Sequence, residues 1–409
     1  MIRLVLLTVL CLMNTGVVWA ADVGVVLRMV PEYHEAERDS LFYLPDSYAV
    51  FNERISRQTV ELNYRRNGLS FLGTAGLTVA EGERADSEGI INELYYDAQV
   101  LGQDISFGKK IMSWGVGFGF RPLDVIQREA RRRLYFWPLE GTPLLAWEHF
   151  SADSAWTLVY ANPLRGEATE RQDDESLALK YYRLLDQVDL HGVARLSERH
   201  KLEVGAGFAH VVSDNLSWHG SFLVQQRYQK TLNALIGDET VLLSAADPTV
   251  TQTFDDGIKA LLGFSWTWDS GMSFLAETWY DSEGYSEQEW QALQTLTQRQ
   301  RALLAQNDIP QAAVYGNIAY NMAYFGQPNL LKQNVLLRLS YDGEKLDPTW
   351  DVQYTPEDGG WVSTIGLKYE GNRHRLDMGL RRFGGDESAA YRLLPRQWSI
   401  FVGWQWAVM

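Results

Sequence analysis

Apolar and polar residues alternate along much of this chain in segments of about ten residues, a pattern that predicts β-strands. The alternation is clearest near the end, at residues 396–408. The large apolar side chains there share one face of a strand: Trp398, Ile400, Val402, Trp404, Trp406 and Val408. The other face holds small or polar residues, with one aromatic exception: Ser399, Gly403, Gln405 and Phe401. We therefore expect a terminal strand with one apolar face.

The same alternation recurs at residues 94–100, 202–208 and 376–380, and short turns with Gly, Asn or Asp separate many segments. Counting segments gives about 16 to 18 strands. Strands in soluble sheets are usually five or six residues long, whereas about ten residues suit a strand that crosses a bilayer. The sequence thus predicts an all-β fold, a transmembrane antiparallel β-barrel. A soluble secreted β-sandwich, such as a lectin, has the same alternation with its faces inverted and is the alternative.

The first 20 residues have the organisation of an export signal. Arg3 precedes the apolar run Leu4–Met13, and Val18 and Ala20 are small residues at the cleavage positions. An N-terminal membrane anchor, the alternative, needs about 20 apolar residues, roughly twice this run. We expect cleavage after Ala20, then an N-terminal periplasmic segment at residues 21–52 and the barrel at residues 53–409.

Composition agrees with an exported barrel. The chain has 15 tryptophans and 20 tyrosines, and aromatic residues gather at both membrane interfaces of such barrels. Its one cysteine, Cys11, lies in the predicted signal, so the mature chain has no disulfide or thiolate metal site. The net charge of −15 argues against a nucleic-acid partner. The histidines lack metal-ligand spacing, and we expect no metal or cofactor.

Two long segments interrupt the strands, at residues 117–141 and 282–330. In the second, Ser286 and Glu289 form a potential capping box before a helical pattern with Trp290 and Leu293. This helix would lie over the barrel mouth or in the lumen, or be a solvated surface helix. The first segment is rich in charged residues: Arg121, Asp124, Arg128, Glu129, Arg131, Arg132 and Arg133.

The approach to the first segment carries a family resemblance. A strand ends at Trp114–Gly115, leaves through further glycines and continues with the Pro122-x-Asp124 step. This arrangement resembles porin-like outer-membrane barrels of proteobacteria, including alginate-export-type channels. Strands of such barrels usually end in Phe or Trp, whereas this chain ends in Met409.

The resemblance implies a location in the cell outer membrane, with its lipids and its insertion machinery as partners, and leaves open whether the barrel is a homo-oligomer. It also implies a loop folded into the pore. By that analogy the arginine-rich segment would line a constriction opposite Glu93 and Asp97. A ring of guanidinium groups in a narrow pore concentrates anions. A charged helix on the outer surface, over residues 125–134, is the alternative.

We therefore predict a channel for small hydrophilic or anionic solutes. The alternative is a barrel that forms part of a polymer export or secretion and assembly system. An outer-membrane lipid hydrolase is a weaker alternative, based on His219 and Ser221, which share one face of a strand. Because Trp218 and Phe222 occupy the opposite, apolar face, these two side chains would point into the lumen, away from lipid. We expect no enzymatic activity.

Overall fold

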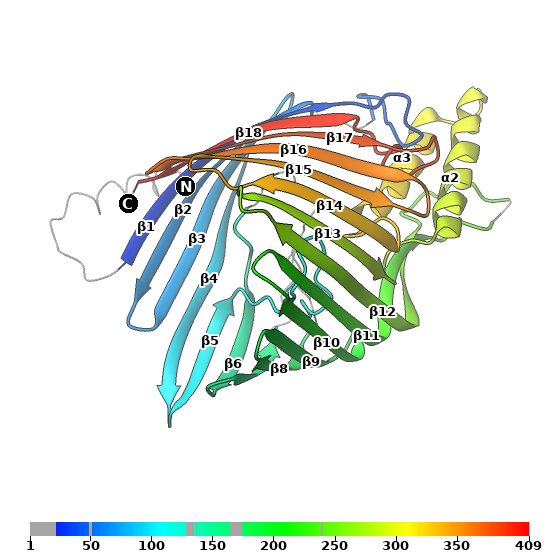
Figure 1. Cartoon of the computed structure of the whole chain (residues 1–409). Helices are drawn as coiled ribbons and strands as arrows, with labels where there is room; N and C mark the ends of the chain where they lie inside the picture. Colours follow the sequence, from blue (N-terminus) through cyan, green and yellow to red (C-terminus); the bar gives the residue numbers. More distant parts are fainter. Residues whose placement is uncertain are drawn as a thin grey trace.

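The structure, a computed structural model, describes residues 22–48, 51–127, 135, 137–163, 174–238 and 240–408. The predicted signal peptide lies outside these residues. Within them, 18 strands form one antiparallel sheet in which each strand pairs with its sequence neighbours. The first strand pairs with both the second and the last, so the sheet closes into a barrel (Figure 1). The predicted antiparallel barrel of 16 to 18 strands is confirmed.

The strands have the following bounds: β1 Asp22–Glu35, β2 Arg54–Arg66, β3 Leu69–Ala80, β4 Asp86–Val100, β5 Gln103–Lys110, β6 Thr142–Phe150, β7 Ser154–Ala161, β8 Ser176–Leu185, β9 Val188–Ser197, β10 Lys201–Val211, β11 Leu216–Asn233, β12 Thr249–Thr267, β13 Met272–Asp281, β14 Gln333–Tyr341, β15 Leu346–Thr355, β16 Gly360–Glu370, β17 His374–Gly384 and β18 Trp398–Ala407.

Alternation decides which side chains face outward. On β7, Trp156, Leu158 and Tyr160 are exposed, whereas Thr157, Val159 and Ala161, which alternate with them, are buried. The exposed residues are large and apolar, and the same holds for Ile400, Val402 and Trp404 on β18. An outward apolar surface with a covered inner face is the arrangement that a bilayer requires of a spanning barrel.

The connections differ between the two ends of the barrel. Turns of two to four residues join strands at the end where β1 begins and β18 finishes, for example at residues 101–102 and 371–373. The opposite end carries the long connections, including residues 111–141 and 282–332. In bacterial outer-membrane barrels, short turns face the periplasm and long loops face outward.

The longest connection contains two helices at this end of the barrel, α2 (Glu287–Ala302) and α3 (Gln311–Asn321), each followed by a short 3₁₀ turn, Leu303–Ala305 and Met322–Gly326 (Figure 1). The Ser286–Glu289 capping box is present. Trp290 and Leu293 pack with Phe42 and Tyr391, from two other loops. The helix is therefore packed against neighbouring loops, and the alternative of a solvated surface helix is wrong. No helix in the described ranges is long and apolar enough to cross a membrane.

The prediction that the barrel begins at residue 53 is wrong. Residues Asp22–Glu35 form β1, which is hydrogen-bonded along its length to β2 and β18. Without this strand, the outer edge of β18 would expose unpaired backbone groups to lipid, at high cost. The run Val25–Leu27 and Pro31 obscure the alternation in this strand, which explains why the sequence pattern missed it.

Candidate functional site

The loop between β5 and β6, in its described residues 111–127, 135 and 137–141, folds into the barrel. Its apolar residues join a buried cluster with side chains of the barrel wall: Met112, Trp114, Leu123, Val125 and Ile126 pack with Leu144, Ala146, Val159, Ala161, Ala178, Val193 and Leu223. These wall residues alternate with exposed, outward residues on their strands. The loop therefore lies against the inner wall. We call residues 111–141 the inward loop.

Asp124 fixes the local shape of the inward loop. One carboxylate oxygen accepts hydrogen bonds from the backbone N–H groups of Trp114 at 2.5 Å and Gly115 at 2.6 Å. The Ser113 hydroxyl lies 3.0 Å from both oxygens. Asp124 is buried, and burial of a carboxylate is tolerated when hydrogen bonds replace its hydration. The Pro122-x-Asp124 step thus has a structural role.

The tip of the loop reaches the wall at β13 and β14. Phe120 stacks on Trp279, with ring centroids 6.0 Å apart, and both pack with Leu261 and Leu336. The backbone N–H groups of Phe118 and Gly119 donate to Glu277 of β13, each at 2.6 Å. The guanidinium of Arg338 lies 4.6 Å from the centre of the Phe118 ring.

The returning part of the loop contacts a different wall. Tyr135 packs with Val30 of β1 and Phe401 of β18, and its ring meets Phe401 edge-on at 5.7 Å. Phe401, the aromatic exception on the polar face of the terminal strand, is thus an inward residue that supports the loop. The loop contacts wall on β6–β9, on β13–β14 and on β18–β1, so it extends across the lumen.

A cavity of about 1240 Å³ remains inside the barrel beside the loop. Phe118, Phe120, Arg121, Asp124 and Tyr135 of the loop line it, opposite side chains of β14–β18 and β1. Four basic wall residues on its lining have acidic partners: Arg28–Glu61 at 2.8 Å, Arg338–Asp351 at 3.0 Å, Lys368–Asp347 at 2.8 Å and Arg375–Asp377 at 2.8 Å. Much of the fixed charge on this wall is therefore balanced.

The sequence pattern did not reveal these wall pairs. Arg28 sits between the apolar residues Leu27 and Met29, and Arg338 sits between Leu337 and Leu339. This alternation could have located them on the inner face. It could not have identified their partners, because the register of neighbouring strands sets the pairing.

The predicted site residues have different positions. Arg121 donates to the Gly117 carbonyl at 2.8 Å and the Ser113 hydroxyl at 2.9 Å, and lies 3.9 Å from Asp124. The remaining members of the segment, Arg128, Glu129, Arg131, Arg132 and Arg133, lie outside the described residues.

The two acidic positions predicted to face the arginines do not line the cavity. Glu93 accepts from the backbone N–H of Ile111 at 2.9 Å, at the start of the inward loop. Asp97 accepts from the Ser106 hydroxyl and lies 3.3 Å from Lys110. Neither is among the described residues around the cavity. Glu93 thus holds the base of the loop, while Asp97 pairs with the end of β5.

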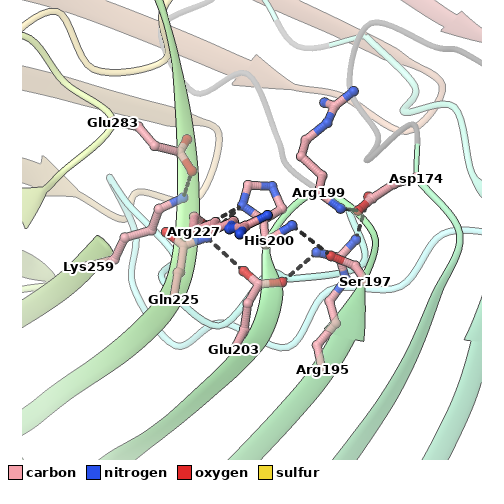
Figure 2. Close-up of polar contacts among 10 residues, drawn as sticks. All are labelled: Asp174, Arg195, Ser197, Arg199, His200, Glu203, Gln225, Arg227, Lys259 and Glu283. Atoms are coloured by element: carbon pink, nitrogen blue, oxygen red, sulfur yellow. Dashed lines mark hydrogen bonds and ion pairs between the residues drawn. The ribbon is translucent and has the colours of Figure 1, made fainter. Parts of the chain in front are cut away.

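A second polar network covers the inner wall of β9–β12 (Figure 2). Arg195 is fully buried and forms ion pairs with Asp174, at 2.7 Å, and with Glu203. Gln225 also donates to Glu203, at 2.7 Å. On the next strand Lys259 pairs with Glu283 at 2.8 Å. Buried charges of this kind are tolerated only when paired, so the network fixes the wall beside the cavity, which Glu203, Lys259 and Glu283 also line.

His219 and Ser221 lie on the inner face of β11. His219 Nε2 is 2.7 Å from the Glu277 carboxylate, and the Ser221 hydroxyl is buried without a hydrogen-bond partner. Their outward neighbours Trp218 and Phe222 are exposed. Among the described residues, no group of three His, Asp or Glu side chains is placed to hold a metal ion.

Comparison with known proteins identifies the fold. No family model matches the sequence, and no curated protein sequence is similar to it. Among solved structures, the chain is similar to OpdK of Pseudomonas aeruginosa, determined with vanillate, with a TM-score of 0.53 and 10% identity over 95% of this chain and 98% of that chain. It is also similar to a triple mutant of the Rhodopseudomonas blastica porin, with a TM-score of 0.44 and 10% identity over 95% of this chain and 99% of that chain. The fold is a porin-type β-barrel.

Proposed function

We propose that this protein is an outer-membrane channel that passes small hydrophilic solutes. The observation that carries the proposal is a closed barrel with an apolar outer surface, a charged cavity and a loop that extends across the lumen. A spanning barrel with a polar interior provides an aqueous path, and a loop inside it limits the size of what passes. The long connections, with α2 and α3, would then face the cell exterior, and the short turns would face the periplasm.

We further propose that the channel prefers anions. The wall pairs largely balance one another, so the arginine-rich segment would decide the selectivity. Ile126 and Gln127, which precede it, are buried in the inward loop, and Tyr135, which follows it, packs on the inner wall. Both ends of this segment are thus inside the barrel, which supports a position of Arg128, Arg131, Arg132 and Arg133 in the lumen.

The alternative function, a barrel of alginate-export type or of a secretion and assembly system, requires a passage for a polymer. The inward loop contacts three separate parts of the wall and narrows the lumen, which favours small solutes. A lipid hydrolase requires catalytic groups within reach of lipid, whereas His219 and Ser221 lie on the inner face.

Planar bilayers test the proposal. The purified, folded protein should produce discrete conductance steps, and its reversal potential in a salt gradient should report anion preference. Folding is verified by a heat-dependent shift in gel mobility. Absence of conductance in every salt, from folded protein that inserts into vesicles, would overturn the channel function. Passage of oligosaccharide chains that block current for long periods would favour the polymer alternative.

A further inference from the structure

We propose that Glu277 is the anchor that holds the loop tip, residues 117–120, across the pore and so sets the pore's aperture. The inference rests on the proposed channel function. It concerns a wall residue that the sequence pattern did not single out, and it makes Glu277 a positioning residue for selectivity.

The carboxylate of Glu277 accepts two hydrogen bonds from the backbone of the loop tip. Its two oxygens accept separately, Oε1 from the Phe118 N–H and Oε2 from the Gly119 N–H, each at 2.6 Å. The side chain is completely shielded from solvent. Hydrogen bonds from backbone N–H groups to an ionised carboxylate are about twice as strong as neutral ones. Two consecutive N–H groups on one carboxylate also fix the orientation of the tip.

His219 holds the carboxylate from the other side. Its Nε2 lies 2.7 Å from Oε1, although the two residues are on β11 and β13 with β12 between them. Gly263 of β12 pairs with both positions and makes the contact possible. A Cβ on Gly263 would lie 2.5 Å from His219 Nε2 and 2.7 Å from Glu277 Cγ. The three strands thus form a site for one carboxylate in a single orientation.

The body of the loop is held by other groups. Leu123 and Val125 are in the apolar cluster on β6–β11, and Asp124 binds the loop's own backbone. Phe120 also stays stacked on Trp279, so loss of the Glu277 carboxylate would release Phe118 and Gly119 while the rest of the loop stays in place. The tip carries Phe118, which lies beside Arg338 and lines the cavity. Its release would widen the pore at this point.

The test compares Glu277→Gln with Asp347→Asn. Both changes remove one carboxylate from the lumen, but Asp347 lies at the short-turn end and pairs with Lys368. Each is combined with Phe118→Cys, and a thiol-reactive methanethiosulfonate is added to folded protein in vesicles. The single native cysteine, Cys11, is in the predicted signal peptide. Single-channel conductance and current noise are recorded for the same variants without Phe118→Cys.

In Glu277→Gln, one amide N–H of the tip loses its acceptor. We expect the introduced thiol at position 118 to react at least roughly tenfold faster than in the Asp347→Asn background, since losing a hydrogen bond to a charged group shifts an equilibrium by about that factor or more. Conductance and noise should rise as well. Should Glu277→Gln fail to fold, His219→Ala removes one of the three contacts of the carboxylate and should increase the reaction rate by a smaller factor.

Equal thiol reaction rates in the Glu277→Gln and Asp347→Asn backgrounds would overturn the anchor, as would equal rates with and without His219→Ala if only that variant folds. A wild-type protein that does not conduct would overturn the channel function instead, while the thiol reaction would still report on the loop tip. The two failures are therefore distinguishable.

Discussion

The ring of Tyr135 lies directly against Gly403 of the terminal strand, where any side chain would collide with it. A Cβ on Gly403 would be 2.6 Å from Tyr135 Cε2, well inside van der Waals contact. The inward loop and the last strand are thus shaped to each other, although the two residues are far apart in the sequence. This contact, with Phe401 beside it, attaches the returning part of the loop to the wall.

Gly403→Ala is expected to displace Tyr135 and destabilise the protein by about 1–3 kcal/mol, the usual cost of overpacking. In a Tyr135→Ala background the same substitution should cost much less, because the ring is gone. Urea unfolding in lipid vesicles measures the free energy of unfolding of the native protein, the two single variants and the double variant. The coupling energy between the two sites should be at least about 0.5 kcal/mol. Fully additive effects would mean that the ring does not occupy this position.

Asp124→Ala should loosen the start of the inward loop. The N–H groups of Trp114 and Gly115 lose their acceptor, at about 1–3 kcal/mol for each buried donor left unpaired. Hydrogen exchange followed by mass spectrometry should show faster exchange in the peptide covering residues 111–127. Asp153→Ala, in an exposed turn, is the control and should leave this peptide unchanged. Unchanged exchange in Asp124→Ala would contradict the role assigned to the carboxylate.

The arginine-rich segment should control ion selectivity. Changing Arg128, Arg131 and Arg132 to Gln is expected to move the reversal potential toward cation preference. The effect should be clearest below about 0.1 M salt, where the Debye length is roughly 10 Å or more and fixed charges are less screened. The control changes three exposed arginines, Arg38, Arg54 and Arg183, whose side chains are 72%, 71% and 48% accessible. A reversal potential equal to that of the control at low salt would mean that the segment does not contribute to the electrostatic potential inside the pore.

At low pH the helix α2 should lose part of its attachment to the barrel, namely the ion pair between Glu289 and Lys230 of β11. Burial of Glu289 acts to raise its pKa, but hydrogen bonds from Lys230, at 2.8 Å, and from the Ser286 backbone outweigh this effect and lower the pKa below the usual 4.5. The stabilisation is therefore fully present above pH 4.5 and is lost as the pH falls through the lower value of the folded protein.

Glu289→Gln tests this attachment. At pH 7 the substitution should weaken hydrogen-exchange protection of α2 by about 1.5–3 kcal/mol, the range for a hydrogen bond to a charged group. Well below pH 4.5, where the carboxylate of the native protein is protonated, the difference should disappear. Glu287→Gln, at an exposed position on the same helix, should have little effect at either pH. A difference in hydrogen-exchange protection between Glu289→Gln and the native protein that does not change with pH would contradict an ionic origin of the stabilisation.

The sequence by itself determined the strands and their outward faces, because both depend on neighbouring residues. A period of two places Ile400, Val402 and Trp404 on one face whatever their surroundings, and the capping box at Ser286 is set within four residues. Only the tertiary structure decided which distant residues meet. The pairing of β1 with β18 closes the barrel, and its signal was weakened by Pro31 and by adjacent apolar residues. The contacts of Glu277 with Phe118 and of Tyr135 with Gly403 follow from the strand register and from the path of the loop through the lumen. Neither of these is encoded in a local pattern, because long-range packing and backbone hydrogen bonding select them together.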